Sequence, residues 1–129
     1  ELARAPVVFE VDVDAISHVN LPAPTEISRQ PVVVRDLAIW VDEGVSYQGL
    51  LDTLKQSIAS DAKLKIVKDI RLFDVWRDKN AEVASAQTSL ALRFWLQDPA
   101  VTLDDQQVED CMKVLLAALV DQHGVRQRA

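Results

Sequence analysis

The sequence has 129 residues, enough for one domain with a hydrophobic core and a short appendage but too few for two full domains. Hydrophobic residues make up 49% and charged residues 26%, as is typical of a folded soluble protein. No apolar run approaches the roughly 20 residues that span a bilayer, and no secretory leader is visible. The single cysteine, Cys111, excludes an internal disulfide and fits a reducing cytoplasm, where we expect the protein to reside. The chain does not begin with methionine, so we expect it to be part of something longer.

The charge is unevenly distributed along the chain. The net charge of −6 argues weakly against nucleic acid as a partner. Residues 1–28 and 99–123 each carry five acidic residues against one basic residue, whereas residues 63–79 carry six Lys or Arg against three Asp. An acidic protein with this pattern can still present a mildly basic surface on one element.

The first pattern is an alternation of apolar and acidic residues over residues 6–16 (PVVFEVDVDAI), which predicts a strand with one wet face. The prolines of residues 21–26 (LPAPTE) then break any regular element and indicate a linker. We therefore expect residues 1–28 to be a strand and linker from a preceding region, and residues 29–129 to form the domain.

Regular elements begin at Pro31. Residues 32–41 are strongly β-forming and end at a turn (DEG), after which Ser46 can cap a helix with leucines at helical spacing. Residues 64–76 (LKIVKDIRLFDVW) return to strand character with basic residues interleaved, and residues 89–96 (SLALRFWL) form a further strand.

The last predicted elements are a helix and a short strand. Asp104 and Gln107 have the form of a capping box, and an apolar stripe then continues to about His123. Gly124 suits the end of this helix, and residues 125–128 predict a final strand. The order β-α-β-β-α-β predicts an α+β, ferredoxin-like domain over about residues 30–128, with a four-stranded antiparallel sheet and both helices on one face.

No catalytic or metal site is predicted. No glycine-rich phosphate loop follows a strand, and no nucleophile lies beside a histidine in sequence. His18 and His123 are too isolated to form a zinc site with Cys111, which we interpret as a core residue. The paired Asp104 and Asp105 stand at a helix start, where they satisfy backbone amides.

Strand alternation separates two faces of the predicted sheet. It places Leu90, Leu92, Phe94 and Leu96 toward the helices, and it places Trp40, Arg93 and Trp95 on the open face. Aromatic rings and guanidinium groups on an open sheet can stack with unpaired bases. The alternative is that the tryptophans pack against the N-terminal segment or another part of a larger protein, because large exposed apolar groups often mark an interface.

Several strings together resemble one family, the C-terminal ferredoxin-fold anticodon-binding domain of bacterial phenylalanyl-tRNA synthetase β subunits. Residues 27–38 (ISRQPVVVRDLA) are similar to the entry into that domain, and residues 72–77 (LFDVWR) resemble its second strand, where tyrosine is usual at the position of Trp76. The other similar strings are residues 8–14 (VFEVDVD), 89–94 (SLALRF), 97–99 (QDP) and 102–104 (TLD). The chain departs from the family pattern in residues 78–87, which lack the usual glycines and carry a single basic residue, Lys79.

The resemblance implies a non-catalytic module that binds the anticodon region of tRNA(Phe). The implied partners are the rest of the β subunit and the α subunit of a heterotetrameric cytoplasmic enzyme, and no membrane is implied. ATP and Mg²⁺ would act elsewhere in that enzyme, so no cofactor is expected in this chain. The expected RNA contacts are Trp40, Arg93 and Trp95 at the centre of the open face, flanked by Arg35 and Trp76. Two alternatives remain, a small-molecule regulatory domain of ferredoxin-like fold and a subunit-docking domain.

Overall fold

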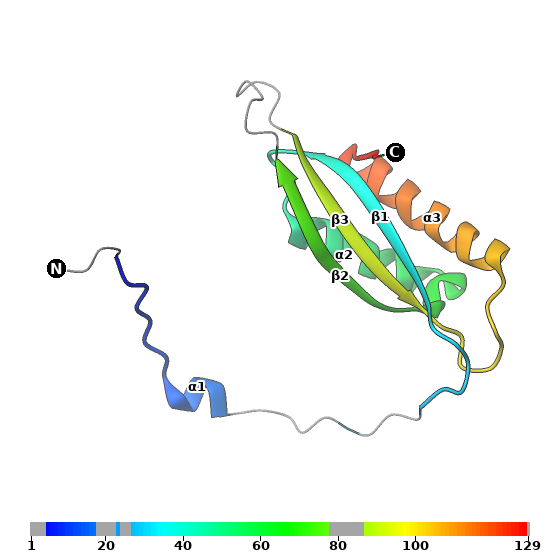
Figure 1. Cartoon of the computed structure of the whole chain (residues 1–129), viewed down its shortest axis with the longest axis horizontal. Coiled ribbons are helices and arrows are strands. Elements are labelled where there is room, and N and C mark those ends of the chain that lie inside the picture. Colours follow the sequence, from blue (N-terminus) through cyan, green and yellow to red (C-terminus); the bar gives the residue numbers. More distant parts are fainter. Residues whose placement is uncertain (1–4, 18–22, 24–26, 78–86, 129) are drawn as a thin grey trace.

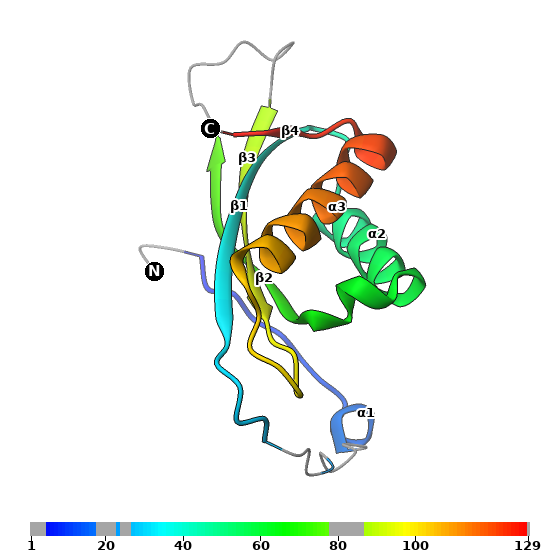
Figure 2. The ribbon, with the colours of Figure 1, turned by 90° about the vertical axis from the view of Figure 1, so that its right-hand side faces the viewer.

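The computed structural model describes residues 5–17, 23, 27–77 and 87–128. Four strands form one antiparallel sheet in the order β2-β3-β1-β4. The two long helices, α2 and α3, both cover the same face of this sheet (Figure 2). The predicted ferredoxin-like α+β fold is therefore confirmed. In chain order the elements are α1 (Val13–Ser17), β1 (Val33–Asp42), α2 (Tyr47–Ser60), the 3-10 helix η1 (Ala62–Ile66), β2 (Val67–Arg77), β3 (Gln87–Leu96), α3 (Asp105–His123) and β4 (Arg126–Gln127).

The helix ends follow the predicted signals. The Ser46 side chain accepts a hydrogen bond from the backbone N–H of Gly49 and so begins α2. Asp104 and Gln107 form the reciprocal capping box at the start of α3. Gly124 adopts the left-handed conformation, with φ of 62°, and its N–H bonds to the Val120 carbonyl at 2.8 Å. These local bonds fix the direction in which the chain leaves each helix and returns to the sheet.

The second strand begins later than its pattern suggests. The predicted strand over residues 64–76 is observed as η1 followed by β2, because the Asp61 side chain accepts from the Lys63 N–H and starts a tight turn. Register shifts interrupt the pairing of β2 with β3 between Val67 and Asp69 and between Leu72 and Asp74. The second shift inserts one residue into β2 and changes which side chains face outward after it.

The N-terminal strand predicted over residues 6–16 is not observed in this structure. Residues 5–12 belong to no strand or helix, and residues 13–17 form the short helix α1. The segment lies away from the sheet (Figure 1), and Val7 and Phe9 are 95% and 83% exposed. A strand is stable only where a neighbour receives its backbone hydrogen bonds, and among the described residues none pairs with this segment.

The core lies between the sheet and the two helices. Leu37, Ile39 and Val41 of β1 and the predicted set of β3 point into it, where they meet the buried leucines of α2 and α3. The alternation that buries these residues leaves the opposite face of the sheet uncovered by helices (Figure 2). In the part of the chain that the structure describes, no helix is long and apolar enough to cross a membrane.

Candidate nucleic-acid interface

The open face is organised by the pairing register of the three long strands. In an antiparallel sheet, residues directly opposite one another point to the same face. Ser89 of β3 lies opposite Trp40 on one side and opposite Trp76 on the other. Further along β3, Arg93 lies between Asp36 and Arg71, and Trp95 lies between Val34 and Asp69. The placement of Trp40, Arg93 and Trp95 on one face agrees with the prediction from alternation.

Two tryptophans meet above Ser89 at the β4 end of the face. The rings of Trp40 and Trp76 are 5.6 Å apart between centroids and inclined by 75°, an edge-to-face contact. Arg128 lies over both rings, at 5.4 and 5.6 Å, and donates a hydrogen bond to the Ser89 hydroxyl at 3.2 Å. Ser89 is consequently only 3% exposed although it lies on the open face. We call these four residues the tryptophan cluster.

Arg93 is engaged within the protein. Its Nε and Nη2 atoms donate to the two carboxylate oxygens of Asp36, both at 2.7 Å, in a bidentate ion pair. The hydrogen bond from Arg93 holds the pKa of Asp36 below its usual value and raises that of the guanidinium, so both groups stay charged. The guanidinium also lies 4.6 Å from the centre of the Phe73 ring. The carboxylate of Asp36 therefore balances the charge of Arg93, which leaves a planar guanidinium group on the open face.

The pattern repeats at the opposite end of the face. The Arg71 guanidinium lies 5.2 Å from the centre of the Trp95 ring, and its Nε donates to Asp69 at 2.7 Å. Each aromatic group of the open face thus lies against an arginine, and Asp36 and Asp69 balance two of these arginines. A half-buried ring held by a guanidinium keeps a fixed orientation, which is what a stacking platform requires.

Arg35 is not part of this surface. It precedes Leu37 by two residues on β1 and so points to the helix side, where its Nη2 lies 3.6 Å from Asp105 of α3. The Asp105 side chain is 96% exposed, so this ion pair contributes little to stability. The expectation that Arg35 flanks the open face is therefore not met.

A flat section separates the tryptophan cluster from Arg93. Ala38 and Ala91 are opposite each other there, and neither has a side chain beyond Cβ. The cluster and the Arg93–Asp36 pair are four residues apart along the strands, a spacing of about 13 Å. Asp74 of β2 lies opposite Ala91 and is exposed, with no ion pair among the described residues. We call Ala38 and Ala91 the alanine floor. The Trp40–Trp76 pair borders it along the strands, and the Asp74 carboxylate lies at its β2 side.

Comparison with known proteins identifies the family. The model of the ferredoxin-fold anticodon binding domain matches residues 28–128. The chain belongs to this family. Phenylalanine–tRNA ligase β subunits are among its relatives, with 52% identity to that of Bordetella pertussis over the whole chain, 42% to that of Dechloromonas aromatica over the whole chain, and 41% to that of Burkholderia pseudomallei over 99% of the chain. The chain spans about one sixth of the length of these relatives, from 15% to 16%.

The open face also contains residues that were not predicted as contacts, among them Arg71, Phe73, Asp74 and Arg128. Phe73 and Asp74 follow from the register shift between Leu72 and Asp74, which strict alternation along β2 does not reveal. Arg128 could have been found from the basic C-terminal end, because it shares the alternation of β4 with Arg126.

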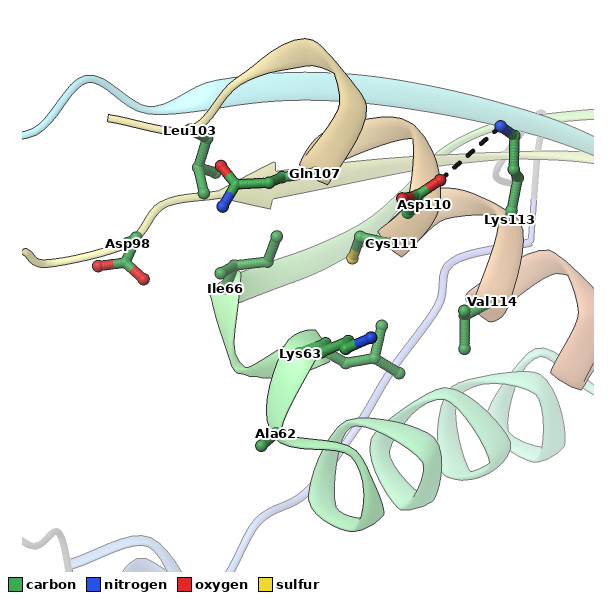
Figure 3. Close-up of a pocket in the computed structure, with 11 residues that line it drawn as sticks. Ala62, Lys63, Ile66, Asp98, Leu103, Gln107, Asp110, Cys111, Lys113 and Val114 are labelled. Atoms are coloured by element: carbon green, nitrogen blue, oxygen red, sulfur yellow. Dashed lines mark ion pairs between the residues drawn. The ribbon is translucent and has the colours of Figure 1, made fainter. Parts of the chain in front are cut away.

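The helix side of the family domain has a different character. A cavity of about 620 Å³ opens between η1 and the first half of α3, where Cys111 lies near Lys63 and Asp110 (Figure 3). Burial, with the nearby Asp61 carboxylate, raises the pKa of the Cys111 thiol to about 11, so the thiol is protonated at neutral pH and is a poor nucleophile. Within the described ranges no three His, Cys, Asp or Glu side chains gather as metal ligands.

Proposed function

We propose that this chain is the anticodon-binding module of a phenylalanine–tRNA ligase β subunit and that it binds tRNA(Phe) through the open face of its sheet. The observation that carries the proposal is the position of all three tryptophans of the sequence on the face opposite the helices, each in contact with an arginine. Family membership and similarity to β subunits support the choice of tRNA as the ligand.

Single-stranded loop bases are the part of a tRNA that this face suits. Unstacked bases bind to aromatic rings and guanidinium planes, and each stacked base contributes roughly 1–3 kcal/mol. The alanine floor leaves room for a base between the Trp40–Trp76 pair and the Arg93 guanidinium. The acceptor-only carboxylate of Asp74 at the side of this floor favours a base with adjacent N–H donors. Guanine has two such donors, at N1 and N2, on one edge.

The module is non-catalytic in this proposal. It raises the affinity for the tRNA and selects it, while aminoacylation with ATP and Mg²⁺ takes place elsewhere in a cytoplasmic heterotetramer of α and β subunits. The rest of the β subunit and the α subunit are the protein partners. The chain matches 16% of the length of the Bordetella pertussis β subunit. The roles of the α subunit and of the rest of the β subunit are therefore part of the proposal.

The test is a titration of the chain with the anticodon stem-loop of tRNA(Phe), compared with a stem-loop in which inosine replaces guanine in the loop. Inosine lacks only the 2-amino group. We expect binding to the first RNA and about ten-fold weaker binding to the second, because one hydrogen bond to a charged acceptor is lost. An Asp74→Asn variant should lose most of this discrimination. Absence of binding at low salt, or equal binding of any RNA of the same length, would contradict the proposal.

A further inference from the structure

The C-terminal strand brings two arginines to the rim of the open face. Arg126 pairs in register with Trp40, and the Arg128 N–H extends the pairing by bonding to the Ala38 carbonyl at 2.8 Å. Arg126 and Arg128 are two residues apart on a strand, so both point to the open face, whereas Gln127 between them faces the helix side near α3. Both arginine side chains are exposed.

No carboxylate balances the charge of Arg126 or Arg128 among the described residues, in contrast to Arg71 and Arg93. Arg71 and Arg93 are within 2.7 Å of Asp69 and Asp36. Arg126 instead donates to the neutral side chain of Gln87, whose amide in turn bonds to Asp42 at 2.8 Å. Arg128 donates to the Ser89 hydroxyl, and neither arginine has an ion pair among the described residues. The positive charge of the open face is therefore concentrated at the β4 edge.

A second group of exposed cations lies elsewhere. Lys63 and Lys65 belong to η1 and Lys68 to the start of β2, at the other edge of the sheet. Lys68 donates to the carbonyl of Lys65 at 3.0 Å. Lys68 lies at the first register shift, directly before Asp69, which is opposite Trp95. Among the described residues, no pair of aromatic rings in contact with each other lies beside these lysines. They lie toward the end of the sheet that holds Trp95, away from the Trp40–Trp76 pair at the β4 end.

We propose that Arg126 and Arg128 form the phosphate-binding edge of the open face, so that a bound RNA strand runs its backbone along β4 and directs its bases inward over β1 and β3. This inference rests on the proposed function. Arg128 lies over Trp40 and Trp76, so a phosphate held there belongs to a nucleotide whose base reaches the tryptophan cluster or the alanine floor. Among the described residues, none of the lysines of η1 and β2 lies over an aromatic ring, which favours the β4 edge for the backbone.

The test compares two double variants that remove the same charge. Binding of the tRNA(Phe) anticodon stem-loop is measured between about 50 and 200 mM salt for the chain, for Arg126→Gln with Arg128→Gln, and for Lys65→Gln with Lys68→Gln. Each phosphate contact to single-stranded RNA contributes about 0.7 to the slope of log affinity against log salt. The arginine variant is expected to lose about 1.4 of this slope and at least ten-fold in affinity at the lower salt, with the lysine variant close to the unmodified chain.

An Arg128→Lys variant separates charge from packing. Lysine keeps the charge and should retain the slope, even though it loses the planar contact with the indoles. A loss of slope with lysine as large as with glutamine would overturn the proposal, as would equal losses in the two double variants. If the arginine variant unfolds, Arg126→Gln alone should lower the slope by about 0.7, and an unchanged slope would refute the inference. Failure of the unmodified chain to bind the RNA would instead defeat the proposed function, and this inference with it.

Discussion

Replacing Phe94 by alanine is expected to lower the free energy of unfolding by about 3–5 kcal/mol, a large part of the stability of a domain of this size. Phe94 is fully buried near the end of β3, among the leucines that face α2 and α3. Its removal leaves a cavity that the two helices cannot close without giving up contacts with the rest of the sheet. Urea denaturation followed by far-ultraviolet circular dichroism measures the change.

The matched control is the next residue along the strand. Trp95 points to the open face, so Trp95→Ala should cost only about 1 kcal/mol, chiefly through its contact with Arg71. Both substitutions remove an aromatic ring from the same strand, and only the face differs. A loss of stability in Trp95→Ala as large as that in Phe94→Ala would mean that the face we describe as open is packed against part of the chain.

Trp76→Ala is expected to weaken binding of the tRNA(Phe) anticodon stem-loop by about 1–3 kcal/mol, roughly five-fold to more than one hundred-fold. Trp76 borders the alanine floor, is 43% exposed, and holds the Trp40 ring in its edge-to-face orientation. The substitution removes the Trp76 ring as a stacking surface, and the Trp40 ring loses the contact that fixes its orientation. Fluorescence anisotropy of a labelled stem-loop measures the affinity.

Val114→Ala is the control for this second prediction, because Val114 is also 43% exposed but lies on α3, on the helix side of the sheet. It should bind the stem-loop as the unmodified chain does. Unchanged binding in Trp76→Ala, with the fold intact, would remove the tryptophan cluster from the interface. Equal losses in both variants would show that the assay reports stability instead of a contact.

The sequence predicted the fold and the two faces of the sheet because both depend on local periodicity. Alternation along β3 separates Phe94 from Trp95 without knowledge of any partner strand, and the capping residues Ser46 and Asp104 act within one turn. The same period-two argument would have placed Arg35 with Leu37 on the helix side, where the structure has it. The flanking position predicted for Arg35 on the open face is therefore excluded by the alternation itself.

The interactions between strands could not be predicted in the same way. The bidentate pair of Arg93 with Asp36 depends on the register of β1 against β3, which nothing local to either strand specifies. Phe73 and Asp74 are adjacent in sequence, and that both face outward depends on the register shift in β2. The N-terminal alternation over residues 6–16 predicted a strand, yet a strand needs a neighbour, and the pattern alone does not supply one.

The three tryptophans allow the most direct test of the claim that the open face binds the RNA. Every indole N–H of the sequence belongs to Trp40, Trp76 or Trp95, so a nitrogen-15 NMR spectrum has three indole resonances, all from this face. Titration with the tRNA(Phe) anticodon stem-loop is predicted to shift all three, with the largest changes at Trp40 and Trp76, while the backbone amides of Val114 and Val120 on α3 stay in place. Shifts confined to the α2 and α3 amides, with the three indole resonances unmoved, would contradict this account.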